Sequence, residues 1–497
     1  MGLVIRAAAR VCTILTGPTA IAVFVALVFA INLFAGFPGI PNDDSDSQYA
    51  QAVDHHFNDW HPPVMAWLWS IFRLLADGNG PMFSFHIACY WLGFGLIAVA
   101  LSRAGRPLAA WGVVGVGLFP PFLAINVNIL KDVGLTVTFL AGFAASFWYR
   151  IDDRRVPWVV AVISTVLLFY GALVRANAVF GAVPLLAYVI NPQWLGRPWR
   201  LLVFSPLVAM VMVPLSGLFN HTVLNATPLG IIRSLEIFNM AGIAFYSGDV
   251  SVFGPGNSFT REDVESCYTP IQWDTLSPWG NCRFFWDRLA VSHDVQEVEK
   301  LTPMAAMEAP PNPDLPKYWV ASIIAHPLAY AQHRLAHFNS EIYFLAQPRR
   351  DNVAPSVPMG EQAGDAPAVS LMRELPQMLY EVLKTPAFWL AVGISLLVLL
   401  ASPSLPRPPA AAEAALSLVI SGLLYTCAYL VIGVATDLRY QFWSMVATFT
   451  ALVIRLSVPR VPFRHVSRGI PRHVKANLLS RNSRSERQWC PYSPSDA

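Results

Sequence analysis

Long apolar runs separated by short polar segments dominate the pattern of this chain. A membrane core about 30 Å thick is crossed by a helix of roughly 20 apolar residues. Runs of about this length lie near 17–37, 82–102, 108–128, 133–150, 157–173, 177–191, 201–219, 386–402, 412–434 and 441–457. The pattern therefore predicts an all-α polytopic membrane protein of about ten transmembrane helices.

The basic residues of the connecting segments predict the orientation, because short cytoplasmic loops carry an excess of Lys and Arg. These residues all fall on one side of the predicted bundle: Arg6, Arg10, Arg103, Arg106, Arg150, Arg154, Arg155, Arg197, Arg200, Arg407 and the stretch after Arg455. An even number of spans then places both termini in the cytoplasm. We expect an integral protein of the bacterial inner membrane, with the opposite loops in the periplasm.

This topology divides the chain into four parts. Residues 1–219 form an N-terminal transmembrane module whose first outer loop covers 38–80, and 220–385 form a large outer-face segment. Residues 386–457 carry the last transmembrane helices, and 458–497 form a basic cytoplasmic tail. Because 231–246 and 318–345 have helical apolar spacing, we expect the outer segment to be a loop domain with helices.

Composition narrows the function classes. The chain is 55% hydrophobic and 13% charged, with a net charge of +3, which is outside the usage of soluble globular proteins. The basic residues do not form one stripe, so nucleic acid is not an expected partner. The six cysteines lack metal-binding spacing. Cys267 and Cys282 share a polar outer loop and could form a disulfide in an oxidising compartment; the alternative is two unpaired thiols.

Acidic groups are concentrated in the first outer loop. Asp43, Asp44 and Asp46 are close together, which suits general-base catalysis or binding of a divalent metal. The alternative is an acidic turn that caps a helix beginning near Gln48. His61 precedes two prolines, which impose an extended entry into the next helix.

Further charged side chains lie at the outer ends of predicted spans. They are Lys131 and Asp132, Arg175, and Arg439 with Tyr440. Charges at such positions usually face the bundle interior or a ligand. Alternatively, each extends singly to the lipid headgroups.

A second group of polar residues follows in the outer segment. His326, His333 and Arg334 have spacing that aligns them along one helix flank. This flank could bind an anionic group, or it could hold the outer segment on the bundle.

Three short motifs resemble the GT-C superfamily of polyprenyl-phosphate-sugar-dependent membrane glycosyltransferases, which includes protein mannosyltransferases and lipid A aminoarabinose transferases. The motifs are Asp44-Ser-Asp-Ser-Gln-Tyr after the first span, Trp60-His-Pro-Pro63, and Asp437-Leu-Arg-Tyr440 before the last span. Many members have Asp-Glu in the first loop, whereas here Ser45 follows Asp44 and Asp46 is the next acid. The resemblance implies a GT-C-like fold and an inverting sugar transfer at the outer face.

The resemblance also implies roles for single residues. Asp44, or alternatively Asp46, would be the general base for a glycan, lipid or protein acceptor. Asp132 would position a cation or, with Asp44, bind Mg²⁺ or Mn²⁺. The remaining residues would bind the phosphate of the polyprenyl-linked donor (Lys131, Arg175, Arg439) or shape the pocket (His61, Tyr440).

Two other functions share this topology. A transporter or flippase of a lipid-linked or small anionic substrate would place its charges near the membrane midplane. A polysaccharide ligase or polymerase would instead centre on arginines and histidines of a large loop, for which His326, His333 and Arg334 are the candidates.

Overall fold

The computed structural model describes residues 16–457 apart from 191–197, 257, 293–297, 299, 344, 347–381 and 402–409. This part of the chain is all-helical and contains no β-strand. The predicted tail at 458–497 and several of the basic residues used for orientation, including Arg6 and Arg407, lie outside the described residues.

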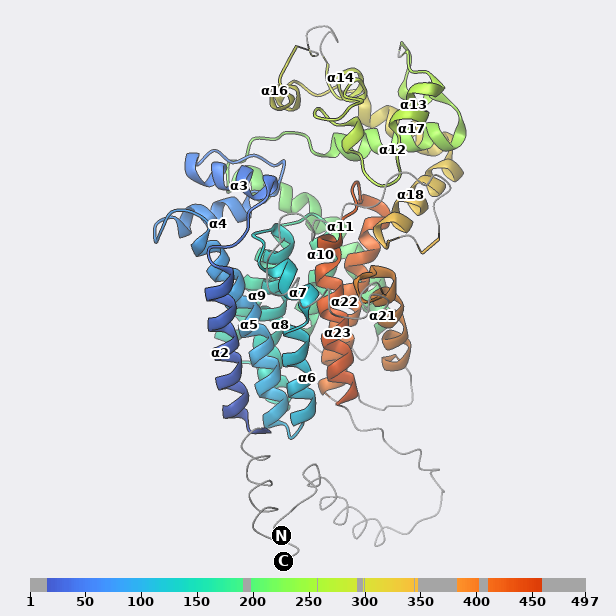
Figure 1. Ribbon diagram of the computed structural model, residues 1–497. Coiled ribbons are helices and arrows are strands. Elements are labelled where there is room, and N and C mark those ends of the chain that lie inside the picture. The colour runs from blue at the N-terminus through green and yellow to red at the C-terminus, as the bar shows by residue number, and fades with distance from the viewer. Residues whose placement is uncertain are drawn as a thin grey trace, which may run out of the picture.

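Most helices lie side by side in one elongated bundle (Figure 1). Eight segments from the N-terminal part and three from the C-terminal part build it: α2 (Pro18–Gly36), α5 (Gly80–Arg103), α6 (Pro107–Gly117), α7 (Pro120–Asn126), α8 (Lys131–Arg150), α9 (Trp158–Leu173), α10 (Ala178–Ile190), α11 (Pro198–Thr222), α21 (Pro386–Leu400), α22 (Ala410–Ile432) and α23 (Phe442–Leu456).

Glycines let the central helices approach closely. A Cβ at Gly93 of α5 would lie 2.7 Å from the Leu140 side chain of α8. A Cβ at Gly142 of α8 would lie 2.9 Å from the backbone oxygen of Ser164 in α9. Small residues at such crossings are typical of helix packing in membranes, where the hydrophobic effect between helices is absent.

Among the described residues, four helices are long and apolar enough to cross a membrane: α2, α5, α11 from Trp199, and α22. The pair α6 and α7 forms a fifth candidate, bent by 49°. The expected spans near 157–173, 177–191 and 386–402 coincide with the shorter apolar helices α9, α10 and α21. Over the described residues, an all-α fold with several helices able to span a membrane is thus confirmed, and ten spans go beyond what these lengths show.

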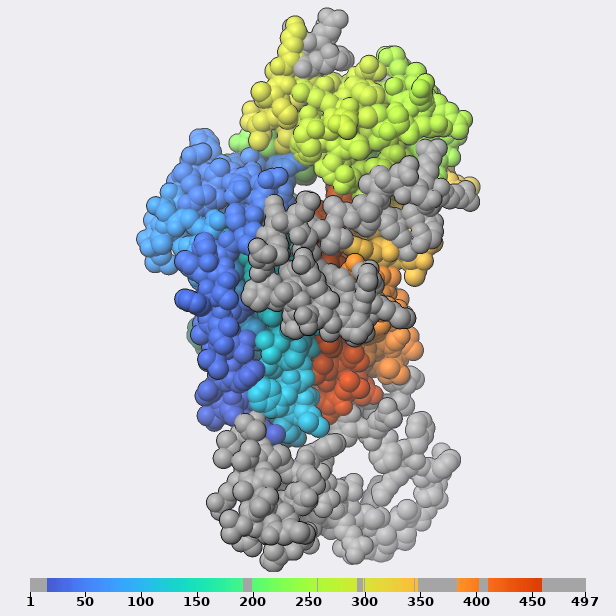
Figure 2. All heavy atoms as spheres, in the orientation of Figure 1, coloured from blue at the N-terminus to red at the C-terminus, as the bar shows by residue number. Residues whose placement is uncertain are grey.

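The outer segment has its own hydrophobic core at one end of the bundle (Figures 1 and 2). Aromatic rings such as Phe253, Phe259 and Phe285 pack within it at centroid distances of 4.5 to 5.6 Å. Its helices are α12 (Ile232–Ser247), α13 (Arg261–Cys267), α14 (Phe284–Leu289), α16 (Pro303–Glu308), α17 (Leu315–Ala325) and α18 (Pro327–Glu341).

The first loop lies at the same end of the bundle as the outer segment (Figure 1). The two are joined by hydrogen bonds. The first loop contains α3 (Asp43–Asp54) and α4 (Val64–Phe72). The Thr227 amide donates to the Phe57 carbonyl at 2.9 Å, and the Leu229 amide donates to the Asp59 carboxylate at 2.6 Å. These bonds hold the first loop and the outer segment together over the end of the bundle.

Candidate functional site: a charged cluster at one end of the bundle

The acidic stretch of the first loop is helical. The Asn42 side chain accepts from the Ser45 amide at 3.0 Å and so caps α3, which begins at Asp43 and not near Gln48 as the capping interpretation expected. Asp44 therefore lies in the first helical turn, and 28% of its side chain is exposed.

Three basic side chains from distant parts of the sequence surround Asp44. Arg439 Nη2 donates to Asp44 Oδ2 at 3.1 Å, and Lys131 Nζ lies 3.6 Å from the same oxygen. His61 Nε2 lies 3.4 Å from Oδ1. The first loop, the start of α8 and the segment between α22 and α23 thus meet at one carboxylate.

The contact between Lys131 and His61 fixes the histidine tautomer. Lys131 Nζ lies 2.7 Å from His61 Nδ1, and a lysine ammonium can only donate. Nδ1 is therefore the acceptor, and the ring proton is on Nε2, which faces Asp44. Lys131, His61 and Asp44 form a continuous polar chain.

A second carboxylate lies deeper in the cluster. Asp132 Oδ1 accepts from Arg175 Nη1, and its Oδ2 lies 3.9 Å from Arg439 Nε. The Arg175 guanidinium also lies over the Tyr440 ring, 4.3 Å from its centroid. Arg175 is thus fixed from several sides, whereas Arg439 connects the two carboxylates.

The electrostatics set the protonation states. Burial raises the pKa of Asp44, but Lys131, His61 and Arg439 outweigh it and hold the pKa well below its usual range. Burial, followed by the charge of Lys131, lowers the pKa of His61, so its imidazole is neutral at pH 7. Burial raises the pKa of Asp437 to about 7 although Arg439 opposes this. Arg439 Nε contacts Asp437 Oδ2 at 2.9 Å.

The outer segment adds residues that the sequence did not single out. Asp274 is half-buried, its pKa is raised by burial, and it interacts with Trp279 and with the charges of Asp44 and Arg439. The Trp279 ring lies 5.4 Å from that of Trp60, which directly precedes His61. The disulfide between Cys267 and Cys282 closes the loop that carries Asp274 and Trp279. No sequence motif marked Asp274, because its approach to Asp44 depends on how the outer segment packs.

Some expected site residues are not in this cluster. Asp46 is exposed and makes no ion pair among the described residues. His326 pairs with Asp249 at 3.0 Å. His333 and Arg334 are buried and both bond the Asn239 side chain.

The contacts of Arg334 favour the structural interpretation of the His326 to Arg334 flank. Arg334 donates to the Tyr429 and Leu430 carbonyls of α22 at 2.8 and 2.9 Å. The flank therefore joins the outer segment to the bundle.

Asp44 and Asp132, the pair expected to bind a divalent cation, are both contacted by Arg439. Within the described part of the chain, no group of three or more His, Cys, Asp or Glu side chains is arranged to hold a metal ion.

Comparison of the chain with protein-family models, with curated proteins and with solved structures finds no match. The function is therefore argued from the cluster itself.

Proposed function

We propose that this protein is a membrane glycosyltransferase that transfers a sugar from a polyprenyl-phosphate-linked donor to a glycan, lipid or protein acceptor. One observation carries the proposal: a partly exposed carboxylate, Asp44, is held among Lys131, His61 and Arg439 at one end of an apolar helix bundle. Base and phosphate-binding groups then lie where a lipid-linked phosphate would reach the membrane surface.

The cations of the cluster suit the donor phosphate. Lys131 and Arg439 both contact Asp44 Oδ2, so an arriving phosphodiester competes with Asp44 for them. As these cations turn toward the phosphate, the charge that depresses the pKa of Asp44 is shared, and the carboxylate becomes a stronger base. Donor binding thus prepares the base for the acceptor.

The transfer step uses both kinds of group. Asp44 removes the proton from an acceptor hydroxyl while that oxygen bonds to the anomeric carbon of the sugar. The bond between this carbon and the phosphate oxygen breaks, and its electron pair stays on the phosphate. Lys131 and Arg439 stabilise the growing negative charge, while Arg175 holds Asp132 and Tyr440 in place. Attack opposite the leaving group inverts the anomeric configuration.

The proposal includes the full membrane topology. We infer about ten spans in the inner membrane of a bacterium, with both termini cytoplasmic and the cluster at the periplasmic face. The polyprenyl chain of the donor would stay in the membrane beside the bundle, and the outer segment would receive the acceptor.

The test is mass spectrometry of surface glycans and lipids from a deletion strain complemented with wild type, Asp44→Asn or Asp46→Asn. We expect a sugar that is present with wild type and Asp46→Asn and absent with Asp44→Asn, because loss of a general base costs about 10²- to 10⁴-fold. Asp46→Asn is the matched control, since it makes the same change on the same helix at an exposed site.

Two results would contradict the proposal. If Asp44→Asn, inserted and folded as wild type, restored the sugar, Asp44 would not be the base. If deletion changed no glycan or glycolipid, the glycosyltransferase assignment itself would fail and transport would become the leading function.

A further inference from the structure

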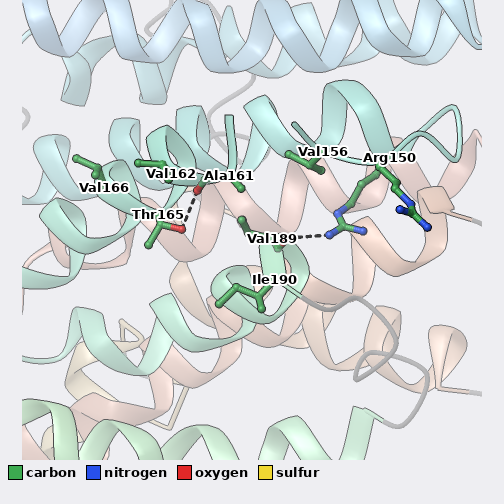
Figure 3. Close-up of a pocket in the computed structure, with 9 residues that line it drawn as sticks. Arg150, Val156, Ala161, Val162, Thr165, Val166, Val189 and Ile190 are labelled. Atoms are coloured by element: carbon green, nitrogen blue, oxygen red, sulfur yellow. Dashed lines mark hydrogen bonds between the residues drawn. The ribbon is translucent and has the colours of Figure 1, made fainter. Parts of the chain in front are cut away.

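A groove of about 590 Å³ lies at the end of α8 that is remote from the charged cluster (Figure 3). Arg150 and Arg155 line it together with apolar side chains that include Val162 and Ile190. Lys131 and Arg150 are the first and last of the 20 residues of α8, so about 30 Å of helix separates the two sites. The groove is therefore not part of the proposed transfer site.

The fold uses the Arg150 guanidinium only in part. Nη2 donates to the Val189 carbonyl at 2.7 Å, as Figure 3 shows, and the Tyr188 ring lies 5.4 Å away. Nε is buried and has no hydrogen-bond partner among the described residues. Because this nitrogen is closed to solvent, an anion in the groove is attracted by the charge of the Arg150 side chain, which lines the groove.

The surrounding charges favour an anion. Arg155 is exposed and lines the groove, whereas the Arg154 guanidinium lies over the Tyr149 ring. Asp152 is engaged by Arg103 Nη2 at 2.6 Å. Asp153 and Glu413, which acts on Arg150 from the first turn of α22, are nearby acids, and neither lines the groove. Among the described residues that line the groove, the charged side chains are Arg150 and Arg155.

The rest of the groove is apolar and open to the surroundings of the bundle. Val162 and Val166 of α9 and Ile190 of α10 line it and are exposed. Its volume falls within the range of roughly 300 to 1,000 Å³ typical of small-molecule sites. A basic end that continues into an apolar channel matches an amphiphile with an anionic head and a hydrocarbon chain.

We propose that this groove binds one anionic phospholipid. The phosphate binds beside the Arg150 and Arg155 side chains, and one acyl chain lies along Val162, Val166 and Ile190. Basic pockets between membrane helices are known to hold anionic headgroups.

Native mass spectrometry of the delipidated full-length protein, titrated with phosphatidylglycerol or phosphatidylcholine, tests this site. We expect phosphatidylglycerol to bind at least several-fold more tightly. Arg155→Gln should weaken its binding about fivefold, the effect of one arginine near an anionic lipid. Arg154→Gln removes the same charge from a neighbour that does not line the groove, and it should weaken binding clearly less than Arg155→Gln does.

A second pair of variants tests the apolar half. Val162→Trp fills the groove and should abolish retention of phosphatidylglycerol. Val159→Trp adds the same volume to an exposed position of α9 outside the groove and should leave retention unchanged.

Three results would overturn the assignment: equal binding of the two lipids, equal effects of Arg155→Gln and Arg154→Gln, or unchanged retention in Val162→Trp. Displacement of the lipid by millimolar inorganic phosphate would also overturn it, because the groove would then bind only the anion. None of these results depends on sugar transfer.

Discussion

Two polar clusters of this protein differ in what their charges contact. Around Asp44, the charged groups Lys131 and Arg439 contact mainly other charged groups, and part of the carboxylate is exposed. Such contacts can be redistributed when an anionic ligand arrives, because the cations can exchange one carboxylate for another acceptor.

Around Arg334, the contacts are neutral and closed to solvent. Its guanidinium donates to two backbone carbonyls of α22 and to the Asn239 side chain, and only 3% of the residue is exposed. His333 bonds the same amide and the Tyr268 hydroxyl. The comparison teaches that basic residues of similar sequence character serve structure where their partners are neutral, and suit chemistry where partners are charged and partly exposed.

The largest effect should come from Arg334→Met, which keeps most of the side-chain volume and removes the donors. Buried acceptors left unsatisfied cost about 1–3 kcal/mol each, so we expect about 3 kcal/mol of lost stability, measured as thermal unfolding in detergent. Arg261→Met, at an exposed residue of α13, is the control and should change little. Unfolding of Arg334→Met at the wild-type temperature would contradict the structural role.

Arg439→Gln should lower activity and leave the unfolding temperature nearly unchanged, whereas Arg334→Met lowers stability. Loss of a cation at the donor phosphate should lower kcat/KM for the donor about 100-fold, while the unfolding temperature changes little. Steady-state kinetics with a defined polyprenyl-phosphate sugar measure the first quantity, and the same detergent melt measures the second. If Arg439→Gln loses folding together with activity, the cluster around Asp44 has a structural role like that of the cluster around Arg334.

Trp279→Ala should have a smaller effect, confined to the acceptor. The indole is 47% exposed next to Asp274 and offers an apolar face to a sugar ring. We expect a rise in KM for the acceptor of up to about tenfold with an unchanged KM for the donor. Trp67→Ala, at another exposed tryptophan of the first loop, should change neither. Equal changes in both KM values would argue against an acceptor subsite.

The smallest effect should be a pH dependence from Asp437. Its pKa is raised from 3.8 to about 7 by burial, so the fold favours the protonated acid over the unfolded chain. This contribution is complete below pH 4 and is lost as the pH rises through 7. Between pH 6 and 7 we expect wild type to lose about 1 kcal/mol more stability than Asp437→Asn.

Glu236 contributes a similar dependence, since burial raises its pKa to about 7. Because this group is present in both proteins, the difference between wild type and Asp437→Asn isolates Asp437. Parallel melting profiles for the two proteins would remove Asp437 as the titrating group.

The sequence predicted much of the charged cluster because sidedness is encoded in local patterns. Apolar runs place Lys131, Arg175 and Arg439 at the same end of the bundle, and the structure brings them together with Asp44 and His61. The pattern could not predict on which face of a helix each acidic side chain lies. Because α3 begins at Asp43, residues two apart point to different faces, which separates Asp46 from Asp44.

The outer segment was harder to predict. Apolar spacing indicated its helices, but the approach of Asp274 to Asp44 depends on tertiary packing between segments far apart in the chain. For His333 and Arg334, spacing alone could not decide between ligand binding and structure. Only the partners, here an amide and backbone carbonyls, distinguish the two.

The disulfide between Cys267 and Cys282 provides a way to measure on which side of the membrane the outer segment lies. These thiols oxidise in the periplasm and stay reduced in a bacterial cytoplasm. Trapping free thiols in intact cells with a maleimide that shifts gel mobility, before and after reduction, therefore reads out which compartment holds the outer segment. If Cys267 and Cys282 react with the maleimide only after reduction, the loop that carries Asp274 and Trp279 lies outside the reducing cytoplasm. This is the compartment in which the proposed sugar acceptor is found.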